Sequence, residues 1–134
     1  MLKKVLSLTL FSALFAASVS AAGSVSGLTD GGTLGKTNAW GSISLSQGGL
    51  FSNDSASGST GSDAAGDLAV GVFLHYATAS SGDNVVEGYN SAKNTRSVST
   101  SATAPNDTGT YVNGGHVYSS SNYGSWSGGT NLDY

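Results

Sequence analysis

The stretch LAVGVFLHYA (Leu68–Ala77) carries apolar side chains at both odd and even positions. A strand that is apolar on both faces is covered on both sides, so we expect it to be central in a sheet. A helix is the alternative for so short a run, but Gly71 and the two valines favour a strand. We therefore predict an interior strand at 67–79, whose core residues are Leu68, Val70, Val72, Phe73, Leu74 and Tyr76.

The rest of the chain lacks the residues that favour helices. After residue 22 it holds one Glu, one Gln, two Lys and one Arg, the side chains that support exposed helical turns. β-branched and aromatic residues instead lie between clusters of Gly, Asn, Asp and Ser, a pattern typical of short strands. The sequence predicts an all-β fold, a small antiparallel sandwich or sheet of about seven short strands, at 24–28, 39–47, 67–79, 84–90, 96–104, 110–119 and 124–134.

Segment 39–47 differs from 67–79 because its apolar residues occupy one parity only. Ile43 and Leu45 share that parity, while Ser42, Ser44 and Ser46 take the other. This alternation indicates a strand with one face on the core and one in water.

Three segments read as loops or turns. Residues 52–62 contain one apolar side chain, so we predict a flexible, exposed loop there. Pro105–Gly109 combines turn-forming residues with a proline that cannot extend a central strand, which predicts a turn between hairpin arms 96–104 and 110–119. Asn113-Gly114-Gly115 offers a second turn or a bulge within the latter arm.

Residues 1–22 have the features of a secretory signal peptide. Two lysines precede an apolar segment that ends in small residues. The segment is interrupted by Ser and Thr, whereas a membrane anchor needs roughly 20 apolar residues. Cleavage after Ala21 or after Ala22 is equally acceptable. We expect a cleaved signal helix at 1–22, a single Gly/Ser/Thr-rich β domain at 23–134, and a secreted or cell-surface location.

The mature chain is acidic and contains no cysteine. Removing residues 1–22 leaves two Lys and one Arg against seven Asp and one Glu, a formal charge of −5. Three scattered cations cannot form the basic patch that phosphate binding requires, which excludes nucleic acid as a partner. The lack of cysteine excludes disulfides, thiol catalysis and a cysteine-based zinc site.

The predicted core is small. Leu, Ile, Val and Phe number 18 in residues 23–134, about 16% of them, below the roughly 20% at which disorder becomes an alternative. Disorder is favoured by high charge, and this chain carries little. We therefore expect it to bury its surface against itself, against further copies or against a bilayer.

No residue pattern in the chain specifies a reaction. His75 and His116 could join Asp63 and Asp67 in a metal site, but their spacing places no histidine pair on one helix or strand face. The Gly-x-Ser-x-Gly motif of a nucleophile elbow is absent. We predict a protein that is not an enzyme and has no catalytic, metal-binding or cofactor-binding residues.

Aromatic residues are the main chemical resource of the predicted strands. Tyr and Trp combine apolar area with a hydrogen-bonding edge, so they can stack on sugars or form an adhesive face. We favour the simpler role of filling a core that is poor in Leu and Ile. The row Val98, Thr100, Ala102 and Ala104 suggests an ice-facing surface, but one row is not an array.

The C-terminal segment SWSGGTNLDY (Ser125–Tyr134) is two-sided up to its last residue. It can complete the sheet of its own domain, pair with the edge of another copy, or close an outer-membrane barrel. The chain is short and poor in lipid-facing residues for a barrel. We therefore predict 124–134 as the candidate assembly strand, through Trp126, Thr130, Leu132 and Tyr134.

These observations predict a secreted structural or surface protein, such as a matrix, fibre or adhesive subunit. A thin core, low charge and edges without blocking Lys or Pro favour self-association through β-edge strands. The expected partners are further copies of the chain, with a cell surface or polysaccharide as additional ones. The alternatives are a small outer-membrane β-barrel, and a secreted toxin or carbohydrate-binding module.

Overall fold

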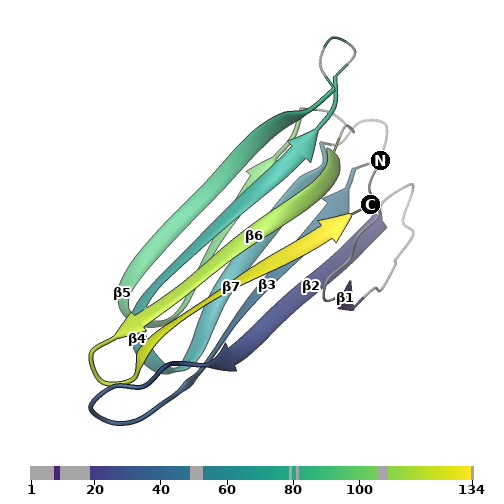
Figure 1. Ribbon diagram of the computed structural model, residues 1–134. Coiled ribbons are helices and arrows are strands. Elements are labelled where there is room, and N and C mark those ends of the chain that lie inside the picture. The colour runs from purple at the N-terminus through teal and green to yellow at the C-terminus, as the bar shows by residue number, and fades with distance from the viewer. Residues whose placement is uncertain are drawn as a thin grey trace.

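The computed structural model describes residues 8–9, 19–48, 53–78, 80, 82–105 and 109–133. These residues form strands and connecting loops, which confirms the all-β prediction (Figure 1). The strands are β1 (Leu8–Thr9), β2 (Val19–Leu28), β3 (Asn38–Gln47), β4 (Ser55–Tyr76), β5 (Asn84–Thr103), β6 (Gly109–Ser120) and β7 (Gly124–Asp133). Among the described residues there is no helix long and apolar enough to cross a membrane.

All strand pairs are antiparallel, and β4 is the strand that joins the others. The hydrogen-bonded order is β1-β2-β3-β4-β6-β7, and β5 pairs with β4 outside this path. Residues 55–62 of β4 pair with β3, and residues 67–76 pair with β6. β5 follows β4 along both halves.

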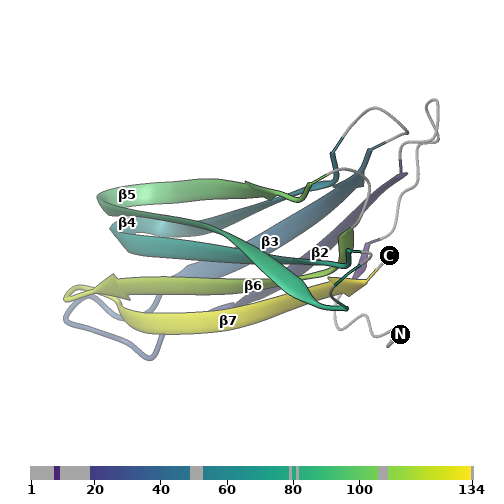
Figure 2. The same ribbon diagram turned by 90° about the horizontal axis from the view of Figure 1, so that it is seen from above.

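The long β4–β5 hairpin is folded back on itself, which produces two layers (Figure 2). One layer contains β2, β3 and the half-strands 55–62 and 97–103; the other contains β6, β7 and the half-strands 67–76 and 84–92. The halves of β4 face each other, since a Cβ placed on Gly58 would lie 2.5 Å from a methyl group of Val72. The strands thus change layers by bending, as in sandwiches whose corners are made by bent or bulged strands.

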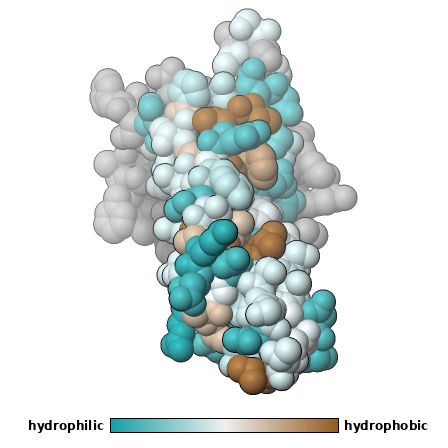
Figure 3. Space-filling model, turned by 90° about the vertical axis from the view of Figure 1, so that its left-hand side faces the viewer, coloured by the Kyte–Doolittle hydropathy of each residue, from teal (hydrophilic) through white to brown (hydrophobic). Residues whose placement is uncertain are grey.

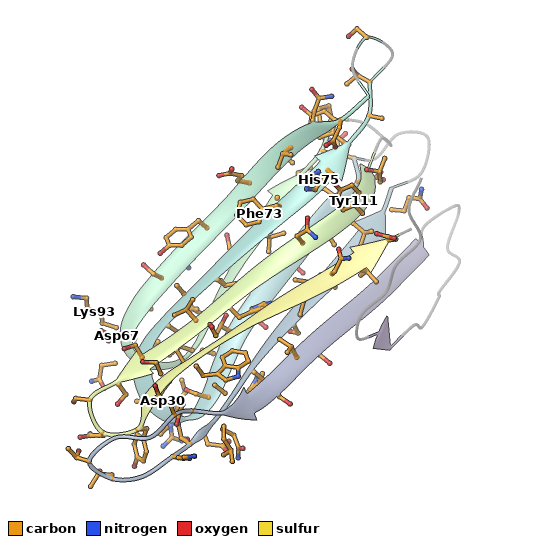
Figure 4. All side chains as sticks on the ribbon, viewed as in Figure 1. Asp30, Asp67, Phe73, His75, Lys93 and Tyr111 are labelled. Atoms are coloured by element: carbon orange, nitrogen blue, oxygen red, sulfur yellow. The ribbon has the colours of Figure 1, made fainter. Side chains whose placement is uncertain are left out.

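Small residues and one tyrosine set the position of the bend. The β4–β5 register shifts on both sides of Gly66, and a Cβ there would lie 2.5 Å from the Tyr118 ring. On β5, Asn94 adopts a positive φ of 50°, and its N–H donates to the Asp67 carboxylate at 3.2 Å. Figure 4 shows Asp67 at this end of the molecule, near Lys93. A bulge of this kind sharpens the local bend of a strand pair.

The core lies between the two layers. On β4, Leu68, Val70, Val72 and Leu74 are at most 2% exposed. Tyr76 is half-buried at the end of this row, whereas Phe73 points to the outer face and is 37% exposed. The outer face of 67–76 is therefore not covered by a further layer, contrary to our expectation of cover on both sides. Ala69 and Gly71 add little apolar surface to that face, so its composition does not require a covering layer.

The two layers also meet along the seam between β2 and β7, so that the sheet is almost closed. The β2–β3 loop contacts the start of β7: Asp30 N–H donates to Ser125 O at 3.0 Å, and the Asp30 carboxylate accepts from Ser125 N–H at 2.7 Å. Leu34 N–H donates to Asn122 O at 2.7 Å. Gly124 has a φ of +84°, and a Cβ there would overlap the Asp30 carboxylate. Figure 4 places Asp30 at this seam.

The predicted loop at 52–62 is wrong from residue 55 onward. Residues 55–62 are the first part of β4, and Ala56, Gly58, Thr60 and Ser62 on its inner face are buried. The segment forms a strand because it has a hydrogen-bonding partner on each side, β3 and β5. The small side chains of this segment predicted a loop, but they are needed in the strand because the two layers approach closely here.

Two predicted connections are also wrong. Segments 84–90 and 96–104 belong to one strand, β5, and β4 rather than β5 pairs with β6, so 96–104 and 110–119 are not hairpin arms. Asn113-Gly114-Gly115 continues β6 without a turn. Both errors arise because long-range pairing keeps the backbone extended through residues that favour turns in isolation.

Most of the predicted signal segment lies outside the described residues. Leu8–Thr9 and Val19–Ala22 are described and are extended, and β1 pairs with Ala22 and Gly23. Cleavage at either expected position would remove β1 but keep the pairing of β2 with β3 from Gly23 to Leu28.

Neighbouring glycines on β6 test how tightly the layers pack. A Cβ on Gly114 would overlap Thr130 and lie 2.5 Å from Ile43, so we expect Gly114→Ala to lower the free energy of unfolding by about 1–3 kcal/mol, as overpacking does. Gly115 faces outward with no atom within 4 Å of an added Cβ, so Gly115→Ala should change it by about 0.5 kcal/mol or less. Urea denaturation measures both; equal losses would contradict close packing at Gly114.

Candidate functional site

The predicted assembly strand lies on the inner face of its own domain. Thr130 and Leu132 of β7 are 5% and 0% exposed, and Trp126 is half-buried against the core. A Cβ placed on Gly27 of β2 would lie 2.7 Å from the indole nitrogen of Trp126. Tyr134 lies outside the described residues. The two-sided pattern of this segment is thus accounted for by the core that it covers.

The edge of β7 that does not pair with β6 faces the seam with β2. Asp30 and Ser125 exchange hydrogen bonds across this seam, and the β2–β3 loop covers the β6–β7 turn. This edge is therefore less accessible than its position at the end of the sheet suggests.

β5 has an open edge in the described sheet that, unlike the free edge of β7, does not face the seam with β2. This strand pairs with β4 alone along its whole length. In the half-strand 84–92, Val85 is 45% and Tyr89 is 71% exposed. Figure 3 faces this side of the molecule and shows separate brown patches rather than one continuous apolar area. We call residues 84–92 the β5 edge.

The second half of β5 is a poorer edge than the first. The Asn90 side-chain amide donates to Ser99 O at 3.0 Å, and Gly88 lies directly against the Ser101 carbonyl, where a Cβ would overlap it. The features that usually protect an edge, a bulge and positive charges, occur at the bend, where Asn94 has its positive φ and Lys93 and Arg96 lie. The β5 edge precedes all of them.

A cluster of ionisable side chains lies on the outer face of β4 and β6. The His75 and Tyr111 rings are stacked, with centroids 3.9 Å apart and planes at 14°, and Figure 4 shows them side by side above Phe73. His75 Nδ1 lies 3.1 Å from the Asp83 carboxylate. Desolvation raises the pKa of Tyr111, and the charges of Asp83 and Asp133 raise it further. These contacts join the end of β4 to the residues before β5 and to β6.

His116 is in the core, far from the surface position of His75. Thr60 donates its hydroxyl to Ala69 O at 2.9 Å, so it accepts from His116 Nδ1–H at 3.0 Å. Nε2 then accepts from the Thr130 hydroxyl at 2.9 Å. The two histidines are thus not brought together, and no group of three His, Asp or Glu suited to a metal ion occurs in the described ranges.

A second surface feature, which the sequence did not suggest, is a field of hydroxyl groups. The outward side chains of β3 and of the half-strands 55–62 and 97–103 are almost all serine, and two serines of β2 continue the field. We call this surface the serine face; its members are Ser24, Ser26, Ser42, Ser44, Ser46, Ser55, Ser57, Ser59, Ser97, Ser99, Ser101 and Thr103, together with Trp40. Alternating serines at 42–46 were visible in the sequence, but their alignment with residues distant in the chain was not.

Burial lowers the pKa of His116 because the charged imidazolium is poorly solvated in the core, and a backbone hydrogen bond with Ser59 opposes this in part. The unfolded chain therefore binds more protons than the folded one as pH falls below the ordinary histidine pKa of about 6.5. We expect stability to be full above that pH, to fall below it, and to level off once the folded histidine is protonated. Urea unfolding midpoints between pH 8 and 5 measure this.

The test variant is His116→Gln. It should cost about 1–3 kcal/mol at pH 8 and lose the slope between pH 7 and 5. An unchanged slope in His116→Gln would show that another group causes it.

Comparison with protein-family models, with curated proteins and with solved structures finds no match to this chain. A function for it must therefore be argued from its two distinctive surfaces, the β5 edge and the serine face.

Proposed function

We propose that this chain is an exported, non-enzymatic surface or matrix protein that self-associates by pairing the β5 edge with the β5 edge of another copy. The observation that carries the proposal is that β5 has a strand partner on one side only. The proposal keeps the predicted edge association but moves it from 124–134 to 84–92, since the apolar residues of β7 are committed to the core. The signal-like segment 1–22 supports export.

An unpaired strand edge presents a row of N–H and C=O groups that another strand can bind. Val85, Val86 and Tyr89 are residue types that favour strands, and the exposed side chains of Val85 and Tyr89 add an apolar contribution. Because the same edge occurs on both copies, an antiparallel pair related by a two-fold axis is the simplest closed assembly.

Two valines of nearly equal exposure provide a matched test. Val85 on the β5 edge is 45% exposed and Val117 on the interior strand β6 is 46% exposed. We expect the mature chain to form dimers or larger species in sedimentation velocity, and Val85→Lys to weaken association at least about tenfold, or about 1.4 kcal/mol. Val117→Lys should associate like the unaltered chain. A mature chain that stays monomeric at high concentration, or equal effects of both lysines, would contradict the proposal.

A further inference from the structure

The serine face is ordered by the strand register. Ser24, Ser42, Ser59 and Ser99 are aligned across β2, β3, β4 and β5, and Ser44, Ser57 and Ser101 form the next row. Three inter-strand gaps at the usual spacing of 4.7–4.9 Å span about 14 Å. The hydroxyl groups therefore form an array rather than a single row.

The hydroxyl groups retain hydrogen-bonding capacity. Ser42 Oγ lies 2.9 Å from Ser59 Oγ, and Ser44 Oγ lies 2.6 Å from Ser57 Oγ. Each such bond uses one donor and one lone pair, so every pair keeps one O–H donor and several acceptor positions. A ligand on this face can thus both donate and accept hydrogen bonds.

The array forms the floor of two neighbouring open hollows. The first, of about 720 Å³, is lined by residues of β3, β4 and β5, and the second, of about 520 Å³, by residues of β2 and β3; Ser42 lines both. Both hollows are shallow and open to solvent, so a ligand here would lie along the surface of the sheet rather than in an enclosed cavity. No charged side chain lines either hollow in the described part of the chain.

Trp40 provides an aromatic surface at one end of the array. It lies opposite Gly61 in the β3–β4 register, and a Cβ on Gly61 would lie 2.5 Å from the indole nitrogen, so the ring covers the glycine. The side chain is nevertheless 39% exposed and lines the second hollow. Trp40 is therefore held by the sheet while part of it stays open to a ligand.

We infer that the serine face binds an uncharged polysaccharide, with the chain lying across β5, β4, β3 and β2 and one sugar ring stacked on Trp40. A sugar presents hydroxyl groups around its ring and C–H groups on its faces, which match the serine array and the indole. An anionic polymer would find no cation in the hollows, and an apolar segment would leave the hydroxyl groups without partners. An uncharged ligand rich in hydroxyl groups is the one that satisfies both features.

This site is separate from the proposed self-association. The serine face uses residues 97–103 of β5, whereas the β5 edge uses residues 84–92, and these half-strands lie in different layers. The monomeric Val85→Lys variant should therefore bind polysaccharide like the unaltered chain.

The test is affinity electrophoresis of the mature protein in gels containing hydroxyethyl cellulose, with polygalacturonate as the acidic comparison, and co-sedimentation with insoluble cellulose and chitin. We expect binding to at least one neutral polymer and at least about tenfold weaker binding by Trp40→Ala and by Ser101→Lys. The matched controls are Phe73→Ala, an outer-face aromatic residue of the other layer that is 37% exposed, and Ser127→Lys on β7; both should bind within about twofold of the unaltered chain.

Several outcomes would overturn the inference. They are failure to bind any of the three neutral polymers, preference for polygalacturonate, or unchanged binding by both Trp40→Ala and Ser101→Lys. Thermal hysteresis in freezing solutions without polysaccharide binding would identify the face as ice-binding instead. Far-UV circular dichroism of each variant separates loss of the site from loss of the fold.

Discussion

The close contact between the two layers is the constraint on which the rest of the structure depends. Gly41, Gly58, Gly88 and Gly114 all lie on inner faces, and a Cβ at any of them would overlap, or press within 2.5 Å of, the opposite layer. Because the backbones approach closely at these points, a small number of larger side chains fills the remaining space: Leu and Val on β4, Ile43 and Leu45 on β3, and Tyr118 and His116 on β6. A chain with few Leu, Ile, Val and Phe residues can therefore form a core. The bend in the β4–β5 hairpin is the means by which one strand pair contributes to both layers.

The same arrangement produces the two surfaces to which we assign function. Folding the hairpin leaves β5 without a second partner, since β3 and β6 occupy the other side of β4 in turn. It also places residues 55–62 beside β3, with residues 97–103 on the other side of this half-strand, so that serines from three segments of the chain align. The two proposals together describe a protein that assembles as a layer on a sugar-rich surface, and the location of the two surfaces in different half-strands allows both kinds of contact at once.

Secondary structure could be predicted where the pattern of side chains was strong. Ile43 and Leu45 alternating with serines identified β3, and Leu68 to Leu74 identified the second half of β4. The first half could not be recognised, because Ala56, Gly58 and Thr60 are inner-face residues that carry no apolar signal; their burial depends on the layer opposite. For the same reason His116 could not be placed: its neighbours Thr60 and Thr130 are 56 and 14 residues away along the chain. Trp126, Thr130 and Leu132 were recognised as one face of a strand, but the sequence could not show whether that face covers the core of its own domain or another copy.

By itself the sequence determined the all-β class, the acidic and cysteine-free character of the chain, and the positions of its strongest strands, because these follow from composition and from local alternation of side chains. The tertiary structure alone decided where β4 and β5 bend, which edge stays open, and which serines share a face. These depend on backbone pairing and on the close approach of small residues from distant segments, and neither leaves a periodic signal in the chain.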